Sequence, residues 1–147
     1  MEQTALTSSC GGGGAPEIAP VRDRSLGTIL HTEASLGWGG QEVRILTEAR
    51  WLTGRGWRVL LVCQPGSGIE RHAGEYGIPT IPVRMRRAYD LCALVALCRV
   101  IRRERVALVH THSSIDGWLG GLCGRVCRVP VVRSRHVSIP VRAGWNP

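Results

Sequence analysis

Short apolar runs and longer stretches of helical periodicity alternate along residues 25–147. Apolar runs bounded by turn residues are typical of buried strands, and apolar residues spaced by three and four positions indicate helices. The runs predict strands at residues 27–32, 57–63, 80–83, 106–110 and 129–134. The periodic stretches predict helices at about residues 41–53, 69–76 and 89–105, and a fourth helix after residue 113. This alternation predicts an α/β fold: a Rossmann-like, three-layer parallel sheet with helical crossovers.

Two of the predicted helices carry clear boundary or stripe signals. Gly54 and Gly56 end the first helix, and Ser113 with Asp116 three residues later forms the pattern of a capping box at the start of the fourth. We interpret a set of apolar residues with complete helical spacing as the stripe of this fourth helix: Ile115, Trp118, Leu119, Leu122, Cys123, Val126 and Cys127.

The chain length of 147 residues is that of one domain. Residues 1–24 contain four consecutive glycines and no strand or helix period, so we expect a disordered leader there and a single domain at residues 25–147. No apolar signal-peptide core is visible at the start, and the longest apolar run, residues 91–98, is too short to cross a bilayer. We therefore expect a cytoplasmic protein with free thiols at its six cysteines.

The formal net charge is +8, with 19 arginines and no lysine. A positive field attracts nucleic acid, anionic lipid and phosphorylated small molecules alike, so charge indicates an anionic partner without choosing among these classes.

Three loops lie where ligands bind in such folds, beyond the carboxyl ends of the strands. In the loop at residues 37–42, Gly39, Gly40 and Gln41 precede the first predicted helix, whose amides would stabilise an anion. The loop matches neither the dinucleotide fingerprint nor a P-loop, so a plain flexible loop is an equal alternative.

The other two loops supply imidazoles and cations. His112 and Ser113 follow the fourth strand, where a histidine can donate to a sugar hydroxyl or a phosphate oxygen, and His110 one step inside is interpreted as structural. Arg135 and His136 follow the fifth strand and offer donors to an anion, although an exposed arginine is usually only solvated.

A zinc site made by Cys123 and Cys127 with the two histidines is disfavoured, because both sulfurs lie on the apolar stripe, and we expect no metal. Seven arginines surround the third predicted helix: Arg84, Arg86, Arg87, Arg99, Arg102, Arg103 and Arg105. They suggest contact with an anionic membrane, and the alternative is a core helix with a solvated basic end.

Taken together and in order, several short segments resemble glycosyltransferase family 4, over about residues 27–145: residues 39–42, 54–59, 73–79, 110–114 and 130–136. The resemblance is greatest to bacterial enzymes that build lipopolysaccharide and other cell-surface glycans. It implies one acceptor-side, N-terminal lobe of the GT-B architecture and retaining transfer from a nucleotide-diphosphate sugar to a glycan or lipid-linked acceptor, without a required metal. It also implies that Gly39 and Gly40 meet the donor diphosphate, that His112 lies near the donor sugar, and that Arg135 and His136 contribute at the fifth strand.

The donor-binding lobe of that family, with its paired-glutamate motif, has no counterpart in residues 1–147, and the acceptor lobe itself looks truncated. We therefore expect the chain alone to be catalytically incompetent. The alternative is a non-catalytic module that binds anionic membrane or glycan. Specific nucleic-acid binding is disfavoured, because the chain has no recognition motif, no phenylalanine and only two tyrosines for base stacking.

Overall fold

The computed structural model describes residues 26–135. They form a five-stranded sheet in the order β3-β2-β1-β4-β5. All neighbouring strands pair in parallel. The strands are β1 (Thr28–Glu33), β2 (Arg58–Cys63), β3 (Thr80–Pro82), β4 (Val106–Thr111) and β5 (Val131–Arg133).

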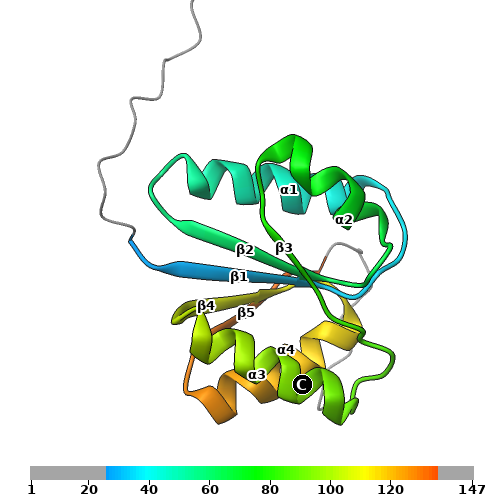
Figure 1. The fold of residues 1–147 in the computed structure, drawn as a ribbon, viewed down its shortest axis with the longest axis vertical. Coiled ribbons are helices and arrows are strands. Elements are labelled where there is room, and N and C mark those ends of the chain that lie inside the picture. The colour runs from blue at the N-terminus through cyan, green and yellow to red at the C-terminus, as the bar shows by residue number, and fades with distance from the viewer. Residues whose placement is uncertain (1–25, 136–147) are drawn as a thin grey trace, which may run out of the picture.

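Helices cover both faces of the sheet, as Figure 1 shows. On one face lie α1 (Gly40–Thr53), α2 (Gly68–His72) and the 3-10 helix η1 (Ala73–Tyr76). On the other lie α3 (Leu91–Arg103) and α4 (Ser114–Cys127). The predicted three-layer α/β fold is therefore confirmed, and the predicted helix and strand ends lie within about two residues of the observed ones. The second predicted helix is the exception, because its last turn is the 3-10 helix η1. The expected leader at residues 1–24 lies outside the described residues.

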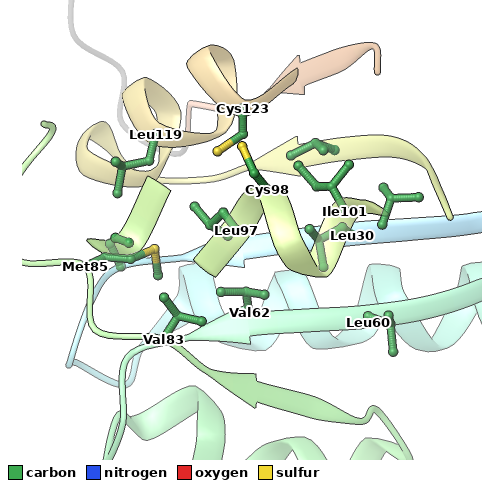
Figure 2. Close-up of a cluster of buried hydrophobic side chains, with 14 residues drawn as sticks. Leu30, Leu60, Val62, Val83, Met85, Leu97, Cys98, Ile101, Leu119 and Cys123 are labelled. Carbon is green, nitrogen blue, oxygen red and sulfur yellow. The ribbon is translucent and has the colours of Figure 1, made fainter. Parts of the chain in front are cut away.

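The strand residues alternate between two cores. Leu30, Val62 and Val109 face α3 and α4, in the cluster drawn in Figure 2, while Val59 and Leu61 face α1 and α2. This alternation follows from the two-residue period of a strand. It also places His31 and His110, which pair in register on β1 and β4, on the α1 side of the sheet.

The stripe predicted for α4 is only partly buried, and this is a correction. Leu119 and Cys123 are buried, but Trp118, Leu122 and Val126 are about half exposed. Ile115 and Cys127 are partly buried against the same core. Two glycines also lie against the sheet, because a Cβ on Gly120 would be 2.5 Å from the Thr111 methyl group and one on Gly124 would be 2.2 Å from a Val131 methyl group. The helix therefore approaches the sheet through its glycine face, which a count of apolar residues does not detect.

Cys123 is fully buried and Cys98 almost so in the α3–α4 core. Figure 2 shows their two sulfur atoms lying in this core. The interpretation of Cys123 as a core residue is thus confirmed.

Candidate functional site

The last residue of β1 is a buried glutamate, which lies at the edge of the sheet formed by the C-terminal ends of the strands. Glu33 is fully buried and accepts hydrogen bonds from the Ser35 amide (2.8 Å) and from the side-chain amide of Gln41. The pKa of Glu33 is raised to about 7, mainly by burial, with the neighbouring Asp116 and Glu42 carboxylates acting in the same direction and the two hydrogen bonds acting in the opposite direction. Glu33 thus ties the two ends of the loop between β1 and α1 together.

The glycine loop ends at the start of α1. Gly39 is the N-cap in an extended conformation, and no side chain caps the helix. A Cβ on Gly39 would meet only the Glu42 carboxylate, at 3.6 Å, and one on Gly40 would meet nothing within 4 Å. The lobe's own packing therefore does not require glycine at either position. Both residues are exposed.

The preceding part of this loop is held against α2. The Leu36 carbonyl accepts from the Gly68 amide at 3.1 Å, and the Trp38 ring stacks on His72 with centroids 3.9 Å apart. A Cβ on Gly68 would lie 2.4 Å from the Gly37 carbonyl oxygen. The loop is fixed on one side by α2 and on the other by Glu33.

Asp116, in the first turn of α4, joins β1 to the end of β4. Its carboxylate accepts from the His112 and Ser113 amides and from the Thr32 hydroxyl, each at 2.8 Å, and also from the Ser113 hydroxyl. Burial raises the pKa of Asp116, and the hydrogen bonds counteract this. The predicted capping box is present, so Ser113 serves the helix N-terminus in this structure.

Three buried histidines lie together on the α1 side of the sheet. His31 Nδ1 and His112 Nε2 are 2.9 Å apart, and the two rings are nearly parallel, with centroids 5.1 Å apart. The His110 ring is tilted against both rings, and its nitrogens contact Ser134 Oγ at 2.7 Å and Glu48 Oε1 at 3.3 Å. The contacts of His110 fit the structural role predicted for it.

His31 is the most deeply buried member of this cluster, with no exposed surface. Burial lowers its pKa to about 3, with a further contribution from His110, so the ring is uncharged at neutral pH. Its Nε2 atom has no hydrogen-bond partner. Leaving a polar group in this state costs about 1–3 kcal/mol.

Within residues 26–135, these three histidines are the group that could hold a metal ion, with ligand atoms within 4.8 Å of one another. The arrangement of the His31 and His112 rings fits a hydrogen bond between them and not coordination of a shared metal ion. Two imidazoles bound to zinc at about 2.0–2.1 Å both point toward the ion, whereas His31 Nδ1 and His112 Nε2 lie at hydrogen-bond distance from each other. Coordination would require the rings to turn.

The third predicted loop is only partly described. The Arg133 side chain lies over the first turn of α4, since a Cβ on Gly117 would be 2.9 Å from Arg133 Nε. Arg135 is exposed, and His136 lies outside the described residues. The fold therefore brings Gln41, His112 and Ser113 to one edge of the sheet with Gly39 and Gly40, and Arg133 approaches the same edge from β5.

Sequence reasoning missed Glu33 and His31 as members of this edge. The signal for both was weak but present, because the His31 imidazole lies within the predicted strand at residues 27–32 and the Glu33 carboxylate follows that strand directly. Asp116 was predicted only as a cap, and its bond to Thr32 spans 84 residues of sequence.

Comparison with known proteins defines the class to which this lobe belongs. The family described as Glycosyltransferase Family 4 matches residues 38–147. The chain therefore belongs to glycosyltransferase family 4, as its motifs suggested.

Among curated proteins, the chain is similar to the UDP-Gal:alpha-D-GlcNAc-diphosphoundecaprenol alpha-1,3-galactosyltransferase of Escherichia coli. The identity is 26% over 108 residues, covering 71% of this chain and 28% of the relative. The chain thus spans less than a third of that relative's length.

Solved glycosyltransferase structures share the fold. A glycosyltransferase from Rickettsia africae superposes with a TM-score of 0.66 at 20% identity, covering 77% of this chain and 31% of the other. For Acinetobacter baumannii MurG the TM-score is 0.65 at 19% identity, with coverages of 78% and 36%. For Anabaena HepE, in complex with UDP and glucose, it is 0.61 at 15% identity, with coverages of 73% and 29%. The fold is that of one Rossmann-like lobe of a GT-B glycosyltransferase.

Proposed function

We propose that this chain is the acceptor-side lobe of a retaining glycosyltransferase that moves a sugar from a nucleotide-diphosphate donor to a glycan or lipid-linked acceptor. The observation that carries the proposal is the uncapped N-terminus of α1 at Gly39 and Gly40, placed at the same sheet edge as His112. Open amides at a helix N-terminus suit a phosphate group. Family membership supports the same reading.

The charges of this edge limit how well the lobe alone would hold a donor. Glu33, Glu42 and Asp116 are all buried here, and carboxylates oppose an approaching diphosphate. We propose that Arg135 and His136 contribute cations from the fifth strand and that the remaining compensation comes from a facing lobe. No metal is part of the proposal.

The chain by itself is therefore expected to bind nucleotide sugars weakly and to transfer no sugar. Catalysis needs preorganised donors at the leaving diphosphate and a cleft closed to water, which a single lobe does not supply. A panel of nucleotide sugars, tested by calorimetry and with lipid and glycan acceptors, measures both properties. Multiple turnover by the 147-residue chain would contradict this proposal.

The role of His112 is tested in the longest protein that the gene encodes. His112→Ala should lower turnover strongly, because a contact to the donor sugar is lost, while His110→Ala should mainly lower the unfolding free energy. Circular dichroism and urea unfolding of both variants separate the two effects. Full turnover by a folded His112→Ala enzyme would reject the assignment.

A second proposal concerns the outer surface of α3 and α4, which we infer contacts an anionic membrane peripherally at the cytoplasmic side. All seven arginines around α3 are exposed. Apolar side chains are exposed beside them: Tyr89, Leu91 and Val95 at α3, and Trp118, Leu122 and Val126 on α4. Mixed basic and apolar surfaces of this kind bind anionic lipid headgroups. In the described range, none of the helices is long and apolar enough to span a bilayer.

Co-sedimentation with vesicles tests this surface. Binding should rise with the anionic lipid fraction and fall with salt, and the double variant Arg87→Glu with Arg99→Glu should abolish it. The matched control reverses two exposed charges on α1, Arg44→Glu with Arg50→Glu, and should retain most of the binding. Equal binding to neutral vesicles, or equal loss in both double variants, would contradict a specific membrane face. Duplex DNA should bind only weakly.

A further inference from the structure

The segment between β3 and α3 presents exposed arginines from an extended backbone. Val83 and Met85 are buried, whereas Arg84, Arg86 and Arg87 are exposed. The alternation over residues 83–86 has the two-residue period of an extended chain. Arg84 and Arg86 therefore lie on the same side of the segment, with Cα atoms about 7 Å apart.

Gln64, the residue that follows β2, fixes this segment. Its side-chain amide donates to the Met85 carbonyl at 2.8 Å, and its side-chain oxygen accepts from the Met85 amide at 3.0 Å. One side chain thus satisfies both backbone polar groups of Met85. The Met85 side chain has no exposed surface and lies in the core between the sheet and α3 and α4 (Figure 2). The backbone that carries the two flanking arginines is therefore held from both sides.

The lobe does not neutralise these arginines. Among the ion pairs within residues 26–135, none includes Arg84, Arg86 or Arg87. Asp90 is an acidic neighbour, but its carboxylate accepts hydrogen bonds from the Arg86 amide and from two amides in the first turn of α3. The pKa of Asp90 is lowered mainly by these backbone hydrogen bonds, and the Arg86 charge adds to the effect. Asp90 therefore serves the helix N-terminus.

The segment lies at the ligand edge of the sheet, but apart from the glycine loop. The Val83 amide donates to the Cys63 carbonyl at 2.9 Å, so the segment continues beside the end of β2, and β2 lies between β3 and β1. Two inter-strand spacings separate it from the end of β1, which is about 10 Å. An anion bound at Arg84 and Arg86 is therefore separate from a diphosphate at Gly39 and Gly40.

We propose that Arg84 and Arg86 bind the phosphate groups of a phosphorylated acceptor, a diphosphate above all, and that Gln64 is the positioning residue for both. Guanidinium groups bind phosphate oxygens in bidentate pairs. Two of them on one side of a fixed backbone can each take one phosphate of a diphosphate. The acceptor role rests on the proposed function, whereas the anion site does not. Anionic lipid headgroups share this chemistry, so the experiments separate the two sources.

Binding is measured by titrating inorganic pyrophosphate and inorganic phosphate into the ¹⁵N-labelled 147-residue chain. The Nε–Hε signals of Arg84 and Arg86 should shift and saturate, with pyrophosphate binding about tenfold tighter than phosphate. Arg84→Gln and Arg86→Gln should each weaken pyrophosphate binding about tenfold, because each removes a charge-assisted contact. Arg44→Gln, at an exposed arginine of α1, is the matched control and should leave binding unchanged.

Two results of this titration would overturn the proposal. One is equal weakening in Arg44→Gln, which would show attraction by net charge alone. The other is a set of shifts confined to the Gly39 and Gly40 amides, which would leave the proposed donor contact standing while refuting the second anion site.

Gln64→Leu tests the positioning role, because it removes both bonds to the Met85 backbone and changes no charge. Gln64 is only partly buried, and Gln64→Ala is a second, smaller variant. Each folded variant, checked by circular dichroism, should bind pyrophosphate severalfold more weakly than the wild type. Wild-type affinity in a folded variant would refute the role of Gln64.

Turnover of the longest protein that the gene encodes distinguishes acceptor from membrane. Arg84→Gln should raise the KM for a diphosphate-linked glycan about tenfold. The KM for the donor, the KM for the same glycan as its methyl glycoside, and binding to anionic vesicles should stay nearly unchanged. Lost vesicle binding with an unchanged acceptor KM would assign Arg84 to the membrane and overturn the proposal. Pyrophosphate binding as expected in a protein that transfers no sugar would refute the proposed function and uphold the anion site.

Discussion

The glycine loop should depend on Gly68 for its position, and Gly68→Ala tests this. An added Cβ would lie 2.4 Å from the Gly37 carbonyl oxygen and 2.6 Å from Trp38 Cβ, whereas ordinary contacts begin at 3.4 Å. The loop must therefore retreat by about 1 Å. That movement stretches the 3.1 Å bond from the Gly68 amide to the Leu36 carbonyl.

The expected cost follows from these two effects. Overpacking of this kind costs about 1–3 kcal/mol, and loss of one backbone hydrogen bond adds about 0.5–1.5 kcal/mol. Alanine recovers at most about 1 kcal/mol through its better helix propensity, and Gly68 lies only at the first position of α2. We expect a net loss of about 0.5–4.5 kcal/mol in the free energy of unfolding.

Urea unfolding followed by circular dichroism measures this loss, and thermal unfolding should show a midpoint lowered by roughly 4 °C per kcal/mol. Gly74→Ala is the matched control, because a Cβ there meets nothing within 4 Å. It should leave stability unchanged or slightly raised. If Gly68→Ala stays within about 0.5 kcal/mol of the wild type, the loop moves freely and is not held by α2.

Three further predictions concern packing and pH. Gly120→Ala and Gly124→Ala should each be less stable than Gly121→Ala by about 1–3 kcal/mol in urea unfolding, because of these three glycines Gly121 alone has open space for a Cβ. Equal stabilities would show that α4 does not pack through its glycines. Since the pKa of Glu33 is raised from 4.5 to about 7, its contribution to stability is present below pH 4.5 and lost as pH rises to about 7. Glu33→Gln should remove this loss, so that above pH 7 its free energy of unfolding exceeds that of the wild type by on the order of 3 kcal/mol at most. If the free energy of unfolding of the variant has the same pH dependence as that of the wild type, Glu33 is not a buried titrating group. His31 has the opposite effect, because its pKa is lowered from 6.5 to about 3, and the folded state therefore loses stability as the pH falls through this range. His31→Leu should reduce this loss when the free energy of unfolding is measured between these two pH values.

Local sequence signals were sufficient for the elements of this fold. The apolar runs predict all five strands, and Ser113 with Asp116 predicts the start of α4, because strand burial and helix capping depend on residues close together in sequence. The same holds for the glycine loop at Gly39 and Gly40, whose position before α1 is a local property. Family motifs added the class of enzyme, which geometry alone does not provide.

The composition of the site edge was decided only by the tertiary structure. Strand β1 lies beside β4, and this order brings His31 to His112 across 81 residues of sequence and Thr32 to Asp116 across 84. A periodic pattern carries no information on which strands become neighbours, so neither bond was predictable from it. The glycine face of α4 was hidden for a related reason: close approach to the sheet depends on the absence of a side chain at Gly120 and Gly124, and a residue without a side chain leaves no mark in a pattern of hydrophobicity.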